Sequence, residues 1–244
     1  MSKGNGEEPR LQFASSPAAA MWIGSRLLPV DPESDAWRWR VGNEVPSGFE
    51  RYLRLLHPVE LEGGQWCTWK HIADLNHTDL YPLTDFRQVA ASADGVRYTG
   101  WPRVGTLQDA VRGSLLTVLA GGDWQRDIWC AYWRGWGQLS ECLQLLTGQN
   151  EWSGTTEEEA TFALPWREYL LLRGPLKALQ MQTSTPGTIL SPQLWWPDDQ
   201  RWFVATDIDY EYSLIGADSN LASRLLSERA LEILEIDWGD HIDT

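Results

Sequence analysis

The sequence lacks the features that would tie it to a common catalytic class. Its 244 residues include only three cysteines, Cys67, Cys130 and Cys142, and none belongs to a CxxC pair. This number and spacing predict neither a disulfide framework nor a zinc site. No GxSxG, HExxH, Walker A or GxGxxG stretch is present, so the usual hydrolase and nucleotide-binding signatures are missing. We therefore expect no cofactor, no metal and no catalytic residue of a common type.

Long apolar runs and basic charge are also lacking. No run approaches the roughly 20 apolar residues that a membrane span needs. The N-terminal MSKGNGEEPR has no apolar core, so we expect no signal peptide, no membrane contact and a cytoplasmic protein with reduced thiols. The formal net charge is −14, and an acidic surface repels phosphate backbones, which argues against nucleic acid as a partner. The same charge suits a basic protein partner.

Tryptophan, in contrast, is abundant. Sixteen tryptophans lie between Trp22 and Trp238 without a fixed period, so the chain has no propeller or solenoid repeat. Residues 1–18 are small and polar and predict a disordered tail, whereas residues 19–244 predict a single domain. Strand and helix patterns are intermixed without steady βαβ alternation. We therefore predict an α+β fold with a mixed, mostly antiparallel sheet and helices packed on one face.

Local patterns predict the individual elements. Hydrophobic periodicity, glycine, proline and capping residues indicate the boundaries. We expect Thr106 and Asp218 or Ser219 to cap helices, and Gly121 to end one. The expected strands cover 18–30, 37–41, part of 45–61, 127–137, 167–176 and 201–216; the expected helices cover 68–76, 85–95, 106–122 and 219–228; a last element covers 231–237; the expected loops cover 149–162 and 180–193.

The stretch TDIDYEY places an acid at every second position. On a strand, Asp207, Asp209 and Glu211 would point to the same side, with neighbours roughly 6.5–7 Å apart at the backbone. A glycosidase needs its two carboxyl groups about 5 to 9.5 Å apart, and carboxylates also suit Ca²⁺ or Mg²⁺. However, a general acid needs a pKa raised by burial. The competing interpretation is a strand face that is simply in contact with water.

The preceding LWWPDDQRW offers a second candidate. Pro197, Asp198 and Asp199 predict a turn that brings three tryptophans to one corner. Exposed rings beside acids bind sugars or form protein hot spots, whereas buried rings would close a hydrophobic corner with the same sequence pattern. The candidate binding residues are Trp195, Trp196, Asp198, Asp199, Trp202, Asp207, Asp209 and Glu211.

Negative charge is concentrated at the carboxyl end. Residues 207–244 contain ten acids and only two arginines, and we expect these carboxylates to be hydrated, unpaired and available for contact. His57, His71 and His77 lie near Cys67, which raises the question of a zinc site or a Cys–His nucleophile. The HIADLNH spacing does not place two imidazoles on one helical face.

Several segments, taken in order, resemble a family of uncharacterised actinobacterial proteins. They are MWIGSRLLPV, VPSGFERYLRLLHP, WCAYWRGWG, REYLLLRGPL and LWWPDDQRWFVATDIDYEYSLIG, and the resemblance covers most of residues 21–226. In element order, tryptophan content and acidity the chain is also similar to the SUKH superfamily, which includes many immunity proteins that neutralise toxins.

The SUKH resemblance implies a non-catalytic cytosolic binding protein that engages a basic protein through an acidic, tryptophan-edged surface. The alternative is a carbohydrate-active hydrolase or sugar-binding protein that uses Asp207, Asp209 and Glu211 with Trp195 and Trp196.

Overall fold

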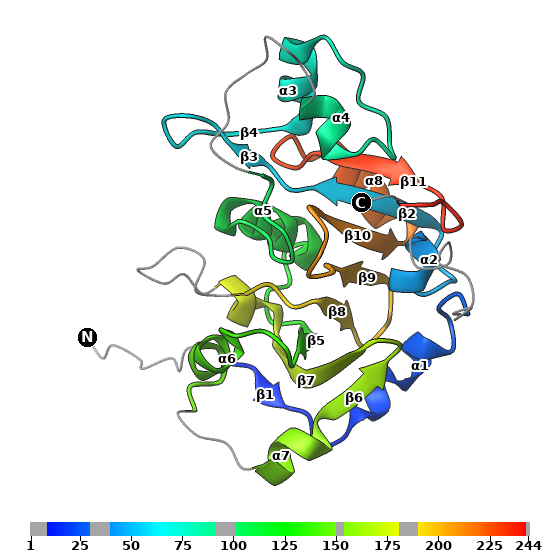
Figure 1. The fold of residues 1–244 in the computed structure, drawn as a ribbon. Coiled ribbons are helices and arrows are strands. Elements are labelled where there is room, and N and C mark those ends of the chain that lie inside the picture. The colour runs from blue at the N-terminus through cyan, green and yellow to red at the C-terminus, as the bar shows by residue number, and fades with distance from the viewer. Residues whose placement is uncertain (1–8, 30–39, 91–100, 150–153, 181–189, 243–244) are drawn as a thin grey trace.

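The computed structural model describes residues 9–29, 40–90, 101–149, 154–180 and 190–242. It confirms the α+β class, because helices accompany a large sheet whose described strand pairs are all antiparallel. Figure 1 shows the strands following one another across the molecule. The sheet order is β1 (Gln12–Phe13), β7 (Arg167–Pro175), β5 (Asp127–Trp133), β8 (Leu194–Pro197), β9 (Trp202–Ala205), β10 (Tyr212–Ala217), β2 (Arg51–Leu56) and β11 (Ile233–Ile236), with β6 (Thr161–Leu164) paired to β7.

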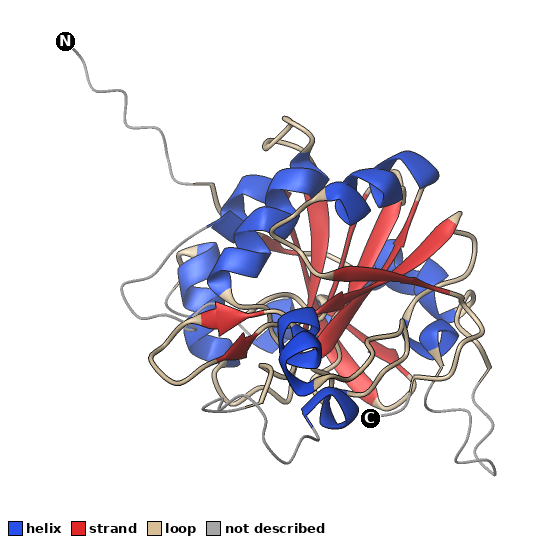
Figure 2. Cartoon of the chain, turned by 90° about the horizontal axis from the view of Figure 1, so that it is seen from above, coloured by secondary structure: helices blue, strands red, loops and turns tan. Residues whose placement is uncertain are grey.

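Both faces of this sheet are buried. The described helices are η1 (Pro17–Ala20), α1 (Met21–Gly24), α2 (Val41–Glu44), α3 (Trp69–Asn76), α4 (Phe86–Ala90), α5 (Asp109–Ala120), α6 (Leu139–Thr147), α7 (Gly154–Glu159), η3 (Leu176–Gln180) and α8 (Ser219–Ser227). The three longest, α5, α6 and α8, pack on one face, as the sequence predicts. The shorter helices α1 to α4 pack against the opposite face, which the expectation of helices on one face did not include. The strands therefore lie between helices in Figure 2.

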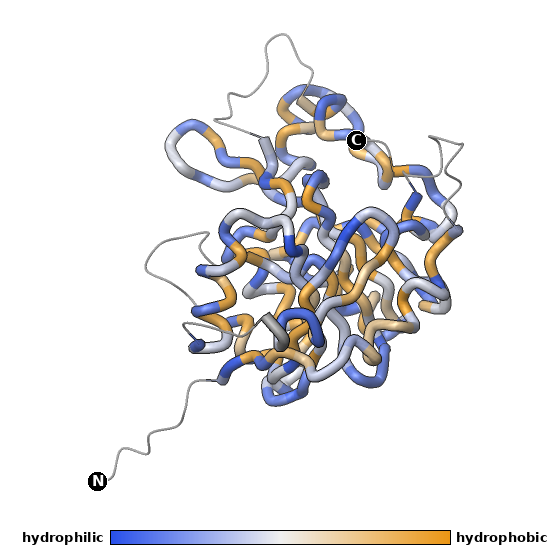
Figure 3. The backbone as a smooth tube through the Cα atoms, turned by 60° about the horizontal axis from the view of Figure 1, so that its bottom comes forward, coloured by the Kyte–Doolittle hydropathy of each residue, from blue (hydrophilic) through white to orange (hydrophobic). Residues whose placement is uncertain are grey.

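Strand alternation divides the tryptophans between the two cores. Neighbouring side chains of a strand point to opposite faces, so Trp195 packs with α5 and α6 whereas Trp196 packs with α1 and Phe203. The hydrophobic segments accordingly gather at the centre of the molecule and hydrophilic segments at its outside (Figure 3). The described residues contain no helix that is long and apolar enough to cross a membrane.

Residues 57–90 and 101–104 form a lobe between β2 and α5. Its described part contains α3, α4 and a hairpin of β3 (Val59–Glu60) and β4 (Trp66–Cys67). Arg54, only 2% exposed, fastens the lobe to the sheet, because its Nη1 donates to the carbonyl oxygens of Pro82 and Thr84, each at 3.0 Å. The guanidinium also lies 3.9 Å from the centre of the Tyr212 ring.

Several predicted elements are correct. The strands within 45–61, at 127–137 and at 167–176 are confirmed, and so are the helices at 68–76 and 219–228. Asp218 caps α8 by accepting from the Leu221 N–H, and Gly121 ends α5 in the left-handed conformation.

Other elements are corrected. Residues 18–24 belong to η1 and α1 instead of a strand, because Ser16 caps this stretch and alanine favours helix. The expected loop at 149–162 contains α7 and the start of β6, and the cap of α5 is Gln108 instead of Thr106. Within the expected tail, Gln12–Phe13 form β1. Most of the expected strand 37–41, with Trp37 and Trp39, lies outside the described residues.

Candidate functional site

The turn between β6 and β7 places a tryptophan at the surface. Because Leu164 pairs with Arg167, only Pro165 and Trp166 form the loop of this hairpin. Proline presets the first loop position, but the second adopts φ 81°, a left-handed value that usually requires glycine. The Trp166 side chain is nevertheless 67% exposed. Backbone strain of this kind is typically retained where the side chain has a role.

A second turn supplies two carboxylates opposite Trp166. The expected single strand at 201–216 is in fact two strands, β9 and β10, and residues 206–211 form the loop between them. Asp207 Oδ1 accepts a hydrogen bond from the Asp209 N–H at 2.9 Å. A side chain that bonds the backbone two residues ahead stabilises a turn against an extended strand. The prediction of three acids in a row on a strand is therefore wrong.

Arg167 joins the two turns. Its Nη2 lies 2.9 Å from Asp207 Oδ2 and 3.1 Å from Asp209 Oδ2. The Asp207 side chain is 9% exposed, whereas that of Asp209 is 56% exposed. Burial alone would lower the pKa of Arg167, but the negative charge of Asp207 and its neighbours raises it. The guanidinium also lies 5.5 Å from the centre of the Trp133 ring, which fixes its position.

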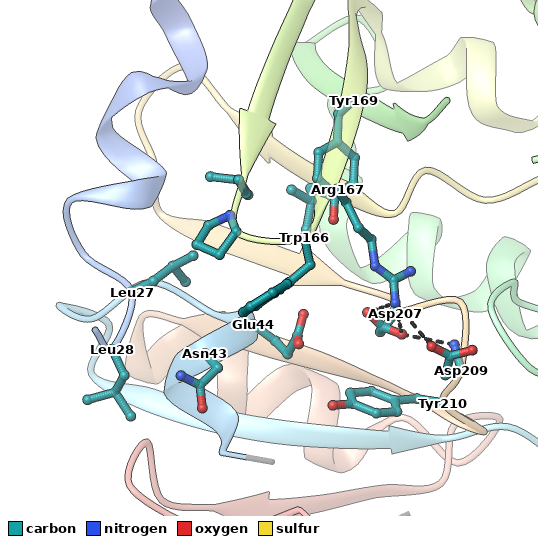
Figure 4. A pocket seen from close by; sticks show the side chains of 13 residues that line it. Leu27, Leu28, Asn43, Glu44, Trp166, Arg167, Tyr169, Asp207, Asp209 and Tyr210 are labelled. Atoms are coloured by element: carbon teal, nitrogen blue, oxygen red, sulfur yellow. Dashed lines mark hydrogen bonds and ion pairs between the residues drawn. The ribbon is translucent and has the colours of Figure 1, made fainter. Parts of the chain in front are cut away.

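These groups line a small pocket (Figure 4). Its cavity volume is ≈ 50 Å³, enough for a few water molecules or one compact polar group, since a water needs about 10–15 Å³. Three carboxylates and one guanidinium give the lining a formal excess of two negative charges. Burial raises the pKa of Tyr169, so this phenol stays neutral. The lining residues are Leu27, Leu28, Asn43, Glu44, Leu164, Pro165, Trp166, Arg167, Tyr169, Leu194, Asp207, Asp209 and Tyr210.

The predicted tryptophan corner is not at the surface. Trp195, Trp196 and Trp202 are 0%, 1% and 2% exposed, which confirms the interpretation of buried rings and corrects their assignment as binding residues. Asp198 is engaged by the Trp129 Nε1–H and by Arg173 Nη2, each at 2.6 Å.

Two further predicted residues also lie outside the pocket. Asp199 accepts from the Arg201 N–H at 3.3 Å, which stabilises the turn after β8. Glu211 is absent from the pocket lining. Burial raises the pKa of Glu211, and the charge of Asp85 raises it further, whereas the charges of Arg87 and Arg54 lower it.

Several acids at the carboxyl end have partners, so the expectation that these acids are unpaired is wrong for them. Asp218 pairs with Arg201 at 2.8 Å and Glu235 with Arg51 at 2.5 Å. The Glu232 carboxylate accepts from two backbone N–H groups at the start of α3, those of Trp69 at 2.6 Å and Lys70 at 2.7 Å. Net charge counts ionic groups but does not reveal their partners, so the composition alone suggested a more open acidic surface.

A serine–histidine pair is present but inaccessible. His57 Nε2 lies 3.0 Å from Ser213 Oγ, and His57 Nδ1 lies 2.6 Å from the Arg103 carbonyl oxygen. The Thr206 hydroxyl continues the chain at 2.7 Å from Ser213 Oγ. All three side chains are 0% exposed, so a substrate has no route to this serine. These hydrogen bonds between Thr206, Ser213 and His57 instead hold the loop after β9 close to the end of β2.

The structure brings Asp207 and Asp209 together with three residues that the sequence did not indicate. These are Trp166, Arg167 and Glu44. The LPWR sequence between two hydrophobic runs is a turn signal that points to Trp166, whereas nothing near Glu44 in the sequence links it to Asp207. Within the described residues, no group of three or more histidines, cysteines and acids is placed to hold a metal ion.

Comparison with known proteins adds no relative. A scan against protein-family models, a search of curated proteins and a search of solved structures each found no match.

Proposed function

We propose that the chain is a non-catalytic binding protein that engages a basic protein partner by taking one of its lysine or arginine side chains into the Trp166 pocket. The observation that carries this proposal is the exposed, strained Trp166 at a pocket whose lining has more carboxylates than cations. An indole ring attracts a cation over its face, and carboxylates accept its N–H groups.

Pocket size favours a side-chain head group over a sugar. A cavity of ≈ 50 Å³ suits an ammonium or guanidinium group but is far below the roughly 300–1,000 Å³ of usual small-molecule pockets. The hydrolase alternative also loses its stacking rings, because Trp195 and Trp196 are buried. Its acids Asp207 and Asp209 share one guanidinium, and a nearby cation favours the ionised carboxylate over a general acid. The SUKH likeness and the immunity-like role stay predictions.

The proposal is tested with short oligolysine and oligoarginine peptides. Binding is followed by the NMR signal of the Trp166 indole N–H, which the Trp166→Gly variant identifies by its loss. We expect this signal to shift on titration with both cationic peptides and not with oligoglutamate.

A matched pair of variants separates the pocket from the general charge of the protein. Asp209→Asn and Asp199→Asn each remove one negative charge, but only Asp209 lines the pocket. We expect Asp209→Asn to weaken binding several-fold and Asp199→Asn to leave it nearly unchanged. Equal effects of both variants would mean that the peptides bind through long-range charge alone, and the proposal would then be wrong.

A further inference from the structure

The strand β11 forms one edge of the sheet and has outward-facing backbone groups. The Leu56 N–H donates to the Glu232 carbonyl oxygen at 2.9 Å, and β2 and β11 are antiparallel. Since hydrogen-bonded positions alternate along such a pair, Leu234 and Ile236 bond to β2. The backbone N–H and C=O groups of Ile233 and Glu235 therefore point away from the sheet. They have no partner in the part of the chain that the structure describes.

A groove lies beside the end of this edge, where it reaches Glu235 and Ile236 of β11. Its volume is ≈ 390 Å³, and its walls are the lobe residues Tyr81, Pro82 and Leu83 on one side and Glu235, Ile236, Asp237 and Asp240 on the other. The Tyr81 and Leu83 side chains are 63% and 39% exposed. Arg54 holds this wall in place through the Pro82 and Thr84 carbonyls. The groove thus combines an open strand edge, an aromatic ring and an aliphatic side chain.

The charge of the groove selects its occupant. Three acids and no base line it. Glu235 also pairs with Arg51 at 2.5 Å, so Asp237 and Asp240 supply most of its negative charge. The Tyr81 hydroxyl donates to a further acid, Asp79, at 3.2 Å. A second copy of this chain would bring its own Glu235 and Asp237 against the same acids, and like charges on facing strands are destabilising. A strand with lysine or arginine side chains would meet carboxylates and the face of Tyr81.

We propose that β11 accepts an extended, lysine- or arginine-bearing segment of a protein partner as an additional antiparallel or parallel strand. The backbone groups of Ile233 and Glu235 would bond to that segment, as in other proteins that bind peptides by strand addition. The acids of the groove would select for basic side chains. This surface is separate from the Trp166 pocket, so the proposal stands even if that pocket binds nothing.

The experiment uses a synthetic peptide of alternating lysine and valine and measures amide hydrogen exchange by NMR. Without peptide, the Ile233 and Glu235 amides should exchange fast and those of Leu234 and Ile236 slowly. We expect the peptide to slow exchange at Ile233 and Glu235 at least tenfold. A version with methylated backbone nitrogens retains the charge but cannot complete a strand ladder, and a glutamate–valine version reverses the charge; neither should protect these amides.

Two variants complete the test. Glu235→Pro removes the outward N–H without removing a bond to β2, and Glu235→Gln removes the same charge but keeps the N–H. We expect only the proline variant to lose protection at Ile233. The proposal is overturned if the methylated peptide protects equally, if the glutamate peptide binds as well, or if no peptide protects Ile233 in the wild-type chain. Protection that rises with protein concentration alone would also overturn it, since the edge would then join two copies of the chain.

Discussion

At the residue scale, His57 gives the stability of the protein a dependence on pH. Burial lowers its pKa from 6.5 to about 4; the hydrogen bond to the Arg103 carbonyl opposes this shift, whereas the charges of Arg103 and Arg54 add to it. The folded protein therefore holds His57 neutral, while the unfolded chain takes up a proton below its ordinary pKa. As the pH falls from 6.5 toward 4, protons bind to His57 in the unfolded chain and not in the folded protein, so the free energy of unfolding decreases. Above pH 6.5 the histidine is neutral in both states and has no such effect.

The corresponding prediction concerns acid conditions. Lowering the pH from about 7.5 to about 5 should cost the wild-type protein about 2 kcal/mol through His57. Urea unfolding of wild type and His57→Gln at both pH values measures this difference, because other titrating groups cancel between the two proteins. A variant whose stability falls as much as that of the wild type would contradict the assignment.

Trp166 yields a second prediction at this scale. Its left-handed backbone at φ 81° is strained for any residue except glycine, and its exposed ring contributes little burial. We expect Trp166→Gly to raise the free energy of unfolding by about 1 kcal/mol. Trp166→Ala is the control, because it removes the same ring but keeps the strain, and should show no such gain. A gain in thermal stability with the alanine variant as well would show that the indole itself, and not the backbone, is unfavourable.

At the element scale, two glycines should respond oppositely to alanine. In β10, a Cβ at Gly216 would lie 2.3 Å from Cδ2 of Phe49, whose ring packs edge-on against Tyr52 at 6.2 Å. The Phe49 ring would have to move, at a cost of roughly 1–3 kcal/mol. In α5, a Cβ at Gly113 meets nothing within 4 Å, so Gly113→Ala should stabilise the protein by about 0.5–1 kcal/mol. Thermal unfolding of both variants tests the pair, and similar shifts in Tm would contradict it.

Elements with a clear local signal were predictable from the sequence. The strand at β5 and the helices α3 and α8 have their own periodicity or capping residues, and the structure confirms them. The break between β9 and β10 was missed, because TDIDYEY alternates like a strand while the deciding contacts are non-local. One of them joins Asp207 to Arg167, which lies 40 residues earlier. The candidate pocket was missed for the same reason, since Glu44, Trp166 and Asp207 come from three separate parts of the chain.

At the scale of the whole molecule, the acidic composition serves two structural roles as well as the proposed binding surfaces. Acids such as Glu232 and Asp218 satisfy backbone N–H groups at helix starts, where carboxylates are favoured. Others pair with arginines across strands or turns, as Glu235 does with Arg51. The negative surface that remains is therefore narrower than the charge of −14 suggests. Acids and exposed aromatic rings occur together at the Trp166 pocket and in the groove beside β11.

Arg54 is one of the links between the lobe and the sheet. This side chain is buried with a pKa lowered by burial, and it satisfies two carbonyl groups of the lobe from one nitrogen. Arg54→Met would keep much of the packing beside Tyr212 but leave the Pro82 and Thr84 carbonyls without their donor, each at a cost of roughly 1–3 kcal/mol. We expect this variant to loosen the lobe before the sheet, and Arg201→Met, at the surface, to have little effect.

Hydrogen exchange distinguishes local from global destabilisation. In Arg54→Met the amides of α3 and α4 should exchange at least tenfold faster. Those of β5 and β7 should change much less, because β8, β9 and β10 separate these two strands from β2 in the sheet. The groove beside β11 would lose its Tyr81 wall at the same time, so binding of the lysine–valine peptide should weaken. If the amides of β7 and α3 accelerate equally, the lobe is an integral part of the sheet core, and Arg54 stabilises the whole fold instead of one wall of a groove.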